Sequence, residues 1–310
     1  MKGDCGSMEA SKKPKKFQGI KISQRPLTEK IEPLLYLSPA LLLLGIFLFW
    51  PFFQTIIRSL HITDNLGRNA LFVGLENYIE LFKSSSFHNS LIVTILFVFI
   101  VVIVGVLLGF FTALLCQRTF PGIRLFSAAY ALPIAIATSG IALVFQVMLN
   151  QSIGIVNQIL GTDINWLADP TYALLSIGIL TGWLNSGLNF LYFSAGLSSI
   201  DESLYESASI DGANWWNKIR HITIPSLKPI TFFVVVTNII NAFQGFAQIR
   251  ILTGGGPGES TNVIVYVIYR NAFMNYRYGY ASAESIVLFV IVVILTIIIF
   301  KVNKGGRINV

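Results

Sequence analysis

Long apolar runs alternate with short polar segments along the whole chain. Six runs can each cross a hydrocarbon core of about 30 Å as a helix, at 34–58, 90–116, 124–149, 172–198, 229–250 and 284–301. The runs are continuously apolar and do not alternate residue by residue, which excludes a transmembrane β-barrel. We therefore expect an all-α membrane protein with six transmembrane helices.

The polar segments divide the chain into four parts. We expect a basic tail at 1–33, a first transmembrane helix at 34–58, a transmembrane domain at 86–301 and a short tail at 302–310. The segment 60–89 holds an amphipathic piece at 75–82 that we expect on the outer membrane surface. A further polar island, 200–228, lies inside the transmembrane domain between its fourth and fifth runs.

Composition supports a membrane protein and limits the other classes. Hydrophobic residues make up 54% of the 310 residues and charged residues 12%, whereas soluble domains carry about 25% charged residues. The net charge of +7 does not indicate a nucleic-acid partner, because the basic residues lie in the N-terminal tail and at the ends of apolar runs. Two cysteines predict no disulfide framework, and the first 33 residues contain no cleavable signal peptide.

The distribution of lysine and arginine predicts the orientation. If the N-terminus is inside, the inner segments hold sixteen of these residues and the outer segments five. We therefore expect both termini and the island 200–228 to be cytoplasmic. The lysine-rich tail fits a disordered cytoplasmic anchor, with specific lipid binding as the alternative.

Neutral polar residues gather in the fourth and fifth runs. They are Asn185, Ser186, Asn189 and Tyr192 in the fourth, and Asn238, Asn241, Gln244, Gly245 and Gln248 in the fifth. Spacings of three and four predict one polar face on each helix. The two interpretations are a substrate pathway, since amides and aromatic rings suit a sugar, and hydrogen bonds between helices.

Ionisable residues are nearly absent from the runs. Glu284, near the start of the sixth run, is the exception. Proton-coupled transport, a voltage sensor and intramembrane proteolysis normally need such residues at membrane depth, so the sequence argues against them. We expect no catalytic residue, metal site or cofactor in this chain.

The island 200–228 carries helix signals. Ser203 and Glu206 fit a capping box, Gly212 fits a helix stop, and a second helical piece is expected at 214–220 before Pro225 interrupts the pattern. These signals alone leave open whether the island is an ordinary structured loop or docks onto another protein.

The same island resembles a known family. The pattern is Glu206-Ser207-Ala208-x3-Gly212-x9-Ile222-x-Ile224-Pro225. It is similar to the EAA loop of ABC-importer permeases, with Ser207 where alanine and Ile224 where leucine is usual. The string Leu-Thr-Gly-Gly-Gly-Pro at 252–257 resembles the carbohydrate-uptake subfamily of the maltose-F and glycerol-3-phosphate-A type. The resemblance covers about residues 34–301 and implies a type-1 ABC transmembrane domain.

The resemblance also implies partners and roles. The island would be a coupling loop seated on a cytoplasmic ABC ATPase dimer, through Glu206, Ser207, Ala208, Asp211, Gly212, Ala213 and Pro225. A second homologous permease would complete the pathway in the membrane lipid, and both would lie in a bacterial cell (inner) membrane. An extracytoplasmic solute-binding protein would contact Gly254, Gly255, Gly256 and Pro257. Ser186, Asn189, Asn238, Asn241 and Gly245 match pathway positions of the maltose type, while Ala242 and Gly245 depart from its amides and leave the sugar open.

ATP chemistry is expected on another chain. The sequence contains no G-x-x-x-x-G-K-[ST] motif, so ATP and Mg²⁺ belong to the partner ATPase. We expect this chain to translocate its solute by alternating access. A sugar or oligosaccharide is the expected solute, because no lysine or arginine lies deep in a run. Import of sn-glycerol-3-phosphate is the alternative; a secondary transporter independent of ATP and a non-transporting scaffold are the rival classes.

Overall fold

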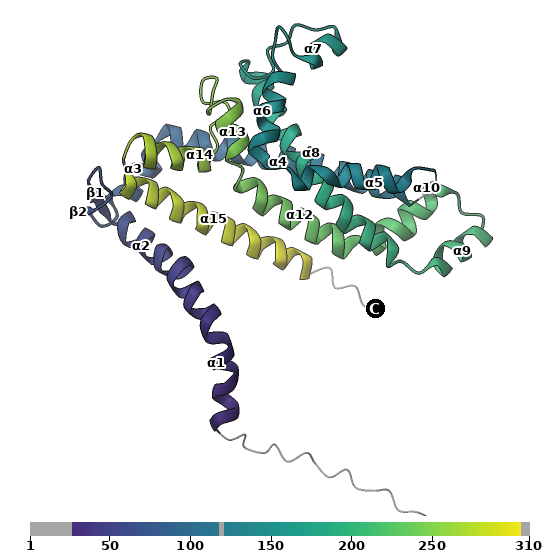
Figure 1. The fold of residues 1–310 in the computed structure, drawn as a ribbon, viewed down its shortest axis with the longest axis horizontal. Coiled ribbons are helices and arrows are strands. Elements are labelled where there is room, and N and C mark those ends of the chain that lie inside the picture. The colour runs from purple at the N-terminus through teal and green to yellow at the C-terminus, as the bar shows by residue number, and fades with distance from the viewer. Residues whose placement is uncertain (1–26, 118–120, 305–310) are drawn as a thin grey trace, which may run out of the picture. The chain divides into compact units, whose positions relative to one another are not determined.

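The computed structural model describes residues 27–117 and 121–304, and it is predominantly helical (Figure 1). Four of its described helices are long and apolar enough to cross a membrane, and the number rises to six when each of two bent pairs counts as one span. The expectation of an all-α membrane protein is confirmed. The chain divides into two compact units, residues 1–52 and 53–310, which are described separately.

The first unit is the apolar start of the chain. It contains α1 (Leu27–Leu44), the π-helical turn η1 (Gly45–Phe49) and the beginning of α2 (Trp50–Ser59). The apolar stretch Tyr36–Ser59 corresponds to the predicted first transmembrane helix. The predicted tail 1–33 lies mostly outside the described residues.

The second unit begins with the rest of α2, which is followed by a hairpin that the sequence analysis missed. Strand β1 (His61–Thr63) pairs antiparallel with β2 (Asn69–Phe72). The Asp64 carboxylate accepts hydrogen bonds from the backbone of Leu66 and Arg68, and Gly67 adopts a positive φ of 75°, which together close the turn. The predicted amphipathic piece follows as α3 (Glu76–Lys83).

The core of this unit is formed by long helices. Helix α4 (Ser85–Cys116) packs along α8 (Pro170–Ser198), and α12 (Lys228–Phe243) packs against both (Figure 1). Phe97 and Val101 of α4 and Ile177 and Leu180 of α8 are buried in the main apolar cluster. Glycines allow this close packing: a Cβ at Gly109 of α4 would lie 2.5 Å from the Cβ of Asn189 on α8.

The third apolar run is broken, contrary to the expected continuous helix. It forms α5 (Ile123–Ala131), the 3₁₀ turn η2 (Leu132–Ala135) and α6 (Thr138–Met148), with a bend of 104°. Pro133 lies in the 3₁₀ turn and supplies no backbone donor, and Ile136 takes an extended conformation. The short helix α7 (Ile155–Leu160) follows in the segment 150–171, where the side chain of Asn157 donates to the carbonyls of Gln151 and Ile164.

The fifth run is also shorter than expected. Helix α12 ends at Phe243, and a separate helix α13 (Ala247–Leu252) packs on α6 and α8. The break is at Gly245, where a Cβ would lie 2.8 Å from the ring of Phe97. The glycine therefore fits against an aromatic ring at the end of α12.

The chain closes with α14 (Ile264–Tyr269), the π-helical turn η4 (Arg270–Met274) and α15 (Tyr278–Lys304). Helix α15 contains the sixth apolar run and starts one and a half turns before it. Helix α14 packs on α4 and α15, and α15 packs on α3 and β1. Phe87 at the start of α4 is buried in an apolar cluster with Leu81 of α3, Ile264 of α14 and Tyr280 of α15.

Candidate functional site

The predicted coupling loop begins with a capped helix. Helix α9 spans Glu202–Ile210, and the Asp201 carboxylate accepts a hydrogen bond from the backbone N–H of Ser203 at 3.0 Å. The prediction of Ser203 as N-cap is wrong by two residues, because the aspartate supplies the acceptor that the helix start needs. This backbone hydrogen bond lowers the pKa of Asp201 below its usual range.

Gly212 ends this helix as predicted. It has a positive φ of 76°, and the N–H of Ala213 donates to the carbonyl of Ala208 at 2.8 Å. A Cβ at Gly212 would meet nothing within 4 Å, so the requirement for glycine is conformational and not steric.

The second helical piece turns back along α9. Helix α10 (Trp215–Lys218) is capped by the Asn214 side chain, which accepts from Asn217 N–H, and continues into the π-helical turn η3 (Ile219–Thr223) and α11 (Ile224–Ser226). The Lys218 ammonium donates to Ser209 Oγ at 2.6 Å, and the hydroxyls of Tyr205 and Thr223 lie 3.0 Å apart. These two contacts connect α9 to the second half of the loop, α10 and η3.

The chain then bends by 66° between Ser226 and Lys228, directly after Pro225 and before Pro229. Pro229 lacks the N–H that would bond back to Pro225 in a continuous helix, which explains the break. The loop therefore joins α8 and α12 as a separate, internally bonded unit.

The loop presents an apolar surface to solvent. Ile210 is 87% exposed and Trp216 59% exposed, and Leu204 is also exposed. Among the predicted coupling residues, Glu206, Ser207, Asp211 and Gly212 are exposed, and Ala208, Ala213 and Pro225 are half-buried. Large apolar side chains on a polar loop are typical of a docking surface.

The predicted polar faces of α8 and α12 meet at one hydrogen-bonded pair. Asn238 Nδ2 donates to Asn189 Oδ1 at 2.7 Å, and Asn189 Nδ2 donates to Asn238 Oδ1 at 3.2 Å. Both residues are buried, and Asn238 Nδ2 also donates to the carbonyl of Val234. Gly105 of α4 leaves room for this pair, since a Cβ there would lie 3.2 Å from both amides.

The hydroxyl of Ser186 also makes its hydrogen bonds within the protein. It lies 2.7 Å from the hydroxyl of Tyr130 on α5 and donates to the carbonyl of Trp183. By contrast, Asn241 and Gln244 are exposed, and Asn185 and Tyr192 are half-buried.

The predicted face through Asn238, Asn241, Gly245 and Gln248 does not exist as one helix face. The break after Phe243 separates Gly245 and Gln248 from α12, and both are buried. The accessible polar residues are therefore those at the end of α12 and on the facing part of α8.

The predicted glycine loop lies between α13 and α14. Gly254 is exposed, Gly255 is buried, and Gly256 and Pro257 are half-buried. Gly254 and Gly255 take positive φ values of 57° and 86°. A Cβ at Gly255 would lie 2.8 Å from the ring of Tyr266, so both its conformation and its packing require glycine.

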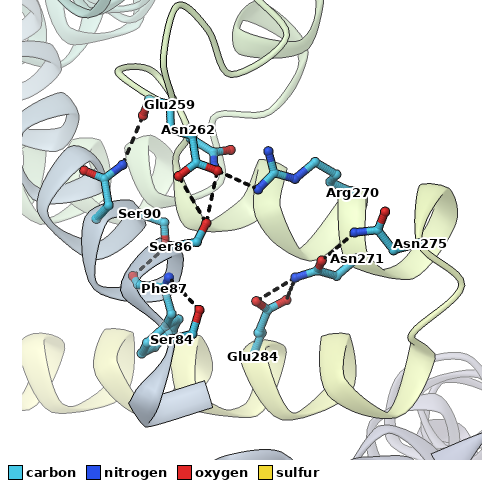
Figure 2. A network of polar contacts seen from close by, with 11 residues as sticks. Ser84, Ser86, Phe87, Ser90, Glu259, Asn262, Arg270, Asn271, Asn275 and Glu284 are labelled. Atoms are coloured by element: carbon cyan, nitrogen blue, oxygen red, sulfur yellow. Dashed lines mark hydrogen bonds and ion pairs between the residues drawn. The ribbon is translucent and has the colours of Figure 1, made fainter. Parts of the chain in front are cut away.

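A polar network next to this loop was missed by the sequence analysis (Figure 2). Glu259 accepts hydrogen bonds from Ser86 and Arg270, and Asn271 donates to both oxygens of Glu284 at 2.9 and 3.1 Å. Glu284 is fully buried beside a polar cavity of about 190 Å³. A single buried glutamate in an apolar run was the available signal for a polar partner nearby.

No group of three or more histidine, cysteine, aspartate or glutamate residues that could hold a metal ion occurs within residues 27–117 and 121–304.

Comparisons with known proteins give the family. Residues 105–305 match the family described as "Binding-protein-dependent transport system inner membrane component". The sn-glycerol-3-phosphate transport system permease protein UgpA of Agrobacterium fabrum is 36% identical over 276 residues, 88% of this chain and 94% of that protein. The Bacillus subtilis protein described as "Probable ABC transporter permease protein YurN" is 33% identical, over 90% of this chain and 98% of its own length.

A solved structure of similar fold is a bacterial ABC transporter involved in the import of the acidic polysaccharide alginate. It superposes with a TM-score of 0.79 at 23% identity, covering 91% of this chain and 99% of the matched chain. A second structure, the alginate transporter in complex with its pentasaccharide-bound periplasmic protein, gives a TM-score of 0.78 at 24% identity. The family match over residues 105–305 and the near full-length similarity to permeases at 33–36% identity place this chain in the family of binding-protein-dependent ABC-importer permeases.

Proposed function

We propose that this chain is one of two permease subunits of an ATP-driven importer that carries a carbohydrate-class solute across the cell membrane. A cytoplasmic ABC ATPase dimer binds the loop 200–228, and an extracytoplasmic binding protein delivers the solute at the opposite ends of the helices. Both termini are cytoplasmic in this proposal. The observation that carries it is the exposed apolar tip of that loop.

The loop is suited to transmit movement. Its two halves are joined by the contacts of Lys218 with Ser209 and of Tyr205 with Thr223, so a force applied at Ile210 moves the whole loop. The loop continues directly into α8 on one side and α12 on the other. Closure of the ATPase dimer would therefore move both helices, which is the requirement for alternating access.

The direction of transport depends on ligands that bind the inward-facing and outward-facing states with different affinities. A ligand shifts a conformational equilibrium only by as much as it prefers one state. The solute-loaded binding protein and ATP must therefore both favour the outward-facing state, and solute release and ATP hydrolysis return the subunit to the inward-facing state.

The accessible polar side chains supply half of a pathway. Asn185, Tyr192, Asn241 and Gln244 offer donors, acceptors and an aromatic face, which are the groups that a sugar binds. The second permease would complete the other half. The remaining predicted pathway residues lie behind these in the helix packing.

We favour a sugar or oligosaccharide as the solute because the membrane-spanning part of the chain carries no deep cation to pair with a phosphate. Similarity to UgpA at 36% identity favours sn-glycerol-3-phosphate as the second candidate. A thermal-shift screen of the partner binding protein separates the two: stabilisation by neutral sugars supports the first, and stabilisation by sn-glycerol-3-phosphate alone supports the second.

Site-specific crosslinking tests the docking of the ATPase. A photoreactive side chain replaces Ile210, and a matched variant carries it at Ile159 of α7, which is also strongly exposed. The proposal predicts an adduct with a protein that carries an ATP-binding motif from position 210 and none from position 159. Equal adducts at both positions, or none at 210 in the assembled membrane complex, would contradict it.

A further inference from the structure

The glycine loop between α13 and α14 has one glutamate, Glu259, at the end nearer α14, and this residue holds that end of the loop through its contacts. Glu259 follows Gly258 and has a positive φ of 65°, a conformation that glycine adopts freely and that other residues avoid. A glutamate in this conformation is held there by its contacts.

Those contacts come from two helical elements and from the loop itself (Figure 2). The carboxylate of Glu259 accepts from Ser86 Oγ of α4 at 3.2 Å and from Arg270 Nη2 of η4 at 3.1 Å. It also accepts from Asn262 Nδ2 at 3.3 Å, and its backbone carbonyl accepts from Asn89 Nδ2 of α4 at 3.1 Å. One residue thus connects the loop to α4 and to η4.

A second contact fixes the same end of the loop to α4. The N–H of Ile264, the first residue of α14, donates to Thr94 Oγ1 at 2.9 Å in a buried position. Thr94 lies about two turns along α4 from Ser86. The loop after Gly258 therefore belongs structurally to α4, and its glycine part connects this end to α13.

The near end of the loop follows α13. Helix α13 packs on α6 and α8, and the hydroxyl of Thr253 at its end lies 2.7 Å from that of Thr261, which links the two ends of the loop. Between the two ends, Gly254, Gly255 and Gly258 supply backbone freedom.

We propose that Glu259 is the positioning residue that holds the glycine segment 254–258 in place for the binding protein and transmits the docking of that protein to α4. This inference rests on the proposed function and on the expectation, from the family resemblance, that the glycine segment contacts the binding protein. Glu259 acts through Ser86, Asn89 and Arg270 and does not touch the solute.

The structure also provides a matched control pair. Arg277 and Glu80 form an ion pair at 2.7 Å between the start of α15 and α3, with both side chains about half exposed. The pair has the same chemistry as Arg270 and Glu259, but among the described residues it makes no hydrogen bond or ion pair with the glycine segment 254–258. A general effect of losing an ion pair would appear equally in both.

The experiment uses the assembled importer in lipid nanodiscs, with both permeases, the ATPase and the solute-loaded binding protein. ATPase rate is measured against binding-protein concentration for the wild type, Glu259→Gln, Glu259→Gly and Glu80→Gln. The glycine variant keeps the backbone conformation and removes the carboxylate, so it separates the role of the contacts from that of the turn. Thermal unfolding of each complex is measured in parallel.

We expect the half-saturating concentration of binding protein to rise about fivefold or more in both Glu259 variants, as charge-assisted hydrogen bonds are lost. The maximal rate at saturation should change by less than about twofold, and Glu80→Gln should match the wild type. An unchanged half-saturating concentration in both Glu259 variants would overturn the inference, and so would a fall in maximal rate and unfolding temperature without a change in that concentration. A wild-type complex that no binding protein stimulates would overturn the proposed function itself.

Discussion

The side-chain amides of Asn189 and Asn238 hydrogen bond to each other in both directions, at 2.7 and 3.2 Å, and join α8 to α12 in the buried core. Each amide uses its donor and acceptor within the protein. Both residues were predicted to line the substrate pathway. In this conformation they connect two helices, and a solute could reach them only if the pair opened.

The first prediction concerns the energy of this pair. Removing one amide leaves its partner buried without a hydrogen bond, so Asn189→Ala and Asn238→Ala should each destabilise the fold by about 1–3 kcal/mol. The double variant should cost less than the two single changes together, by about 0.6–1.7 kcal/mol. The free energies of unfolding of the wild type, the two single variants and the double variant are measured in detergent, as a double-mutant cycle. Strictly additive energies would contradict the pair, and a stable double variant without import would place both amides in the pathway.

The second prediction concerns the contact of α4 with α8. Gly109→Ala would place a Cβ 2.5 Å from the Cβ of Asn189 and 3.1 Å from the backbone of the same residue, so the helices must separate. We expect a loss of about 1–3 kcal/mol in stability. Gly140→Ala in α6 is the control, because a Cβ there meets nothing within 4 Å, and it should be neutral or stabilising by about 0.5–1 kcal/mol. Equal unfolding temperatures for the two variants would contradict this packing.

The third prediction concerns the start of the loop 200–228. The hydrogen bond from Ser203 lowers the pKa of Asp201 in the folded protein, so the ionised cap stabilises α9 at all pH values above the ordinary value of 3.8. This contribution is lost as the pH falls below 3.8 through the lowered folded value. Hydrogen exchange of the backbone amides of Ser203 and Leu204 measures the cap.

The variants of this cap should separate charge from hydrogen bonding. Asp201→Ala should speed exchange at neutral pH, whereas Asp201→Asn should retain protection and lose the dependence on acid pH, because asparagine is also a good N-cap. Protection in the alanine variant equal to that of the wild type would show that Asp201 does not cap α9.

The fourth prediction concerns coupling. Glu206 is exposed on α9, so Glu206→Lys should leave membrane insertion and stability unchanged and abolish most ATP-driven import. Asp163→Lys, an equally exposed charge reversal in the segment 150–171, is the control and should import normally. Normal import by the Glu206→Lys variant, with the ATPase still bound, would remove this residue from the coupling surface.

Much of the fold could be predicted because the apolar runs dominate the sequence. The helical membrane class and the permease family, predicted from run length and the loop motif, are confirmed. Gly212 was predictable as a helix end, since the left-handed conformation there favours glycine. The roles of the coupling and pathway residues remain predictions.

The errors have local causes that a hydropathy pattern does not contain. The helix breaks near Pro133, but the residues around this break are all apolar, so the length of the apolar run alone predicted one continuous helix. The end of α12 depends on the ring of Phe97 fitting against Gly245, a tertiary contact. The cap of α9 is Asp201, two residues before the Ser203 that the capping-box pattern indicated. The hairpin was missed because its strands have only three and four residues.

The reciprocal pairing of Asn189 with Asn238 could not be predicted either. Spacing on each helix indicates which residues share a face, but it does not show which face of α8 meets which face of α12. Gly105 and Gly109 determine that approach by allowing α4 to pack closely against α8 and the amide pair. The sequence analysis favoured a substrate pathway at these two positions, although hydrogen bonds between the helices were also compatible with the sequence.

ATP-driven uptake into proteoliposomes tests the central claim most directly. Vesicles containing this chain, its partner permease and the ATPase are supplied with loaded binding protein on one side and ATP on the other. The account predicts uptake only when every component and ATP are present. Uptake into vesicles that hold this chain without the ATPase, at the same rate with and without ATP, would contradict it.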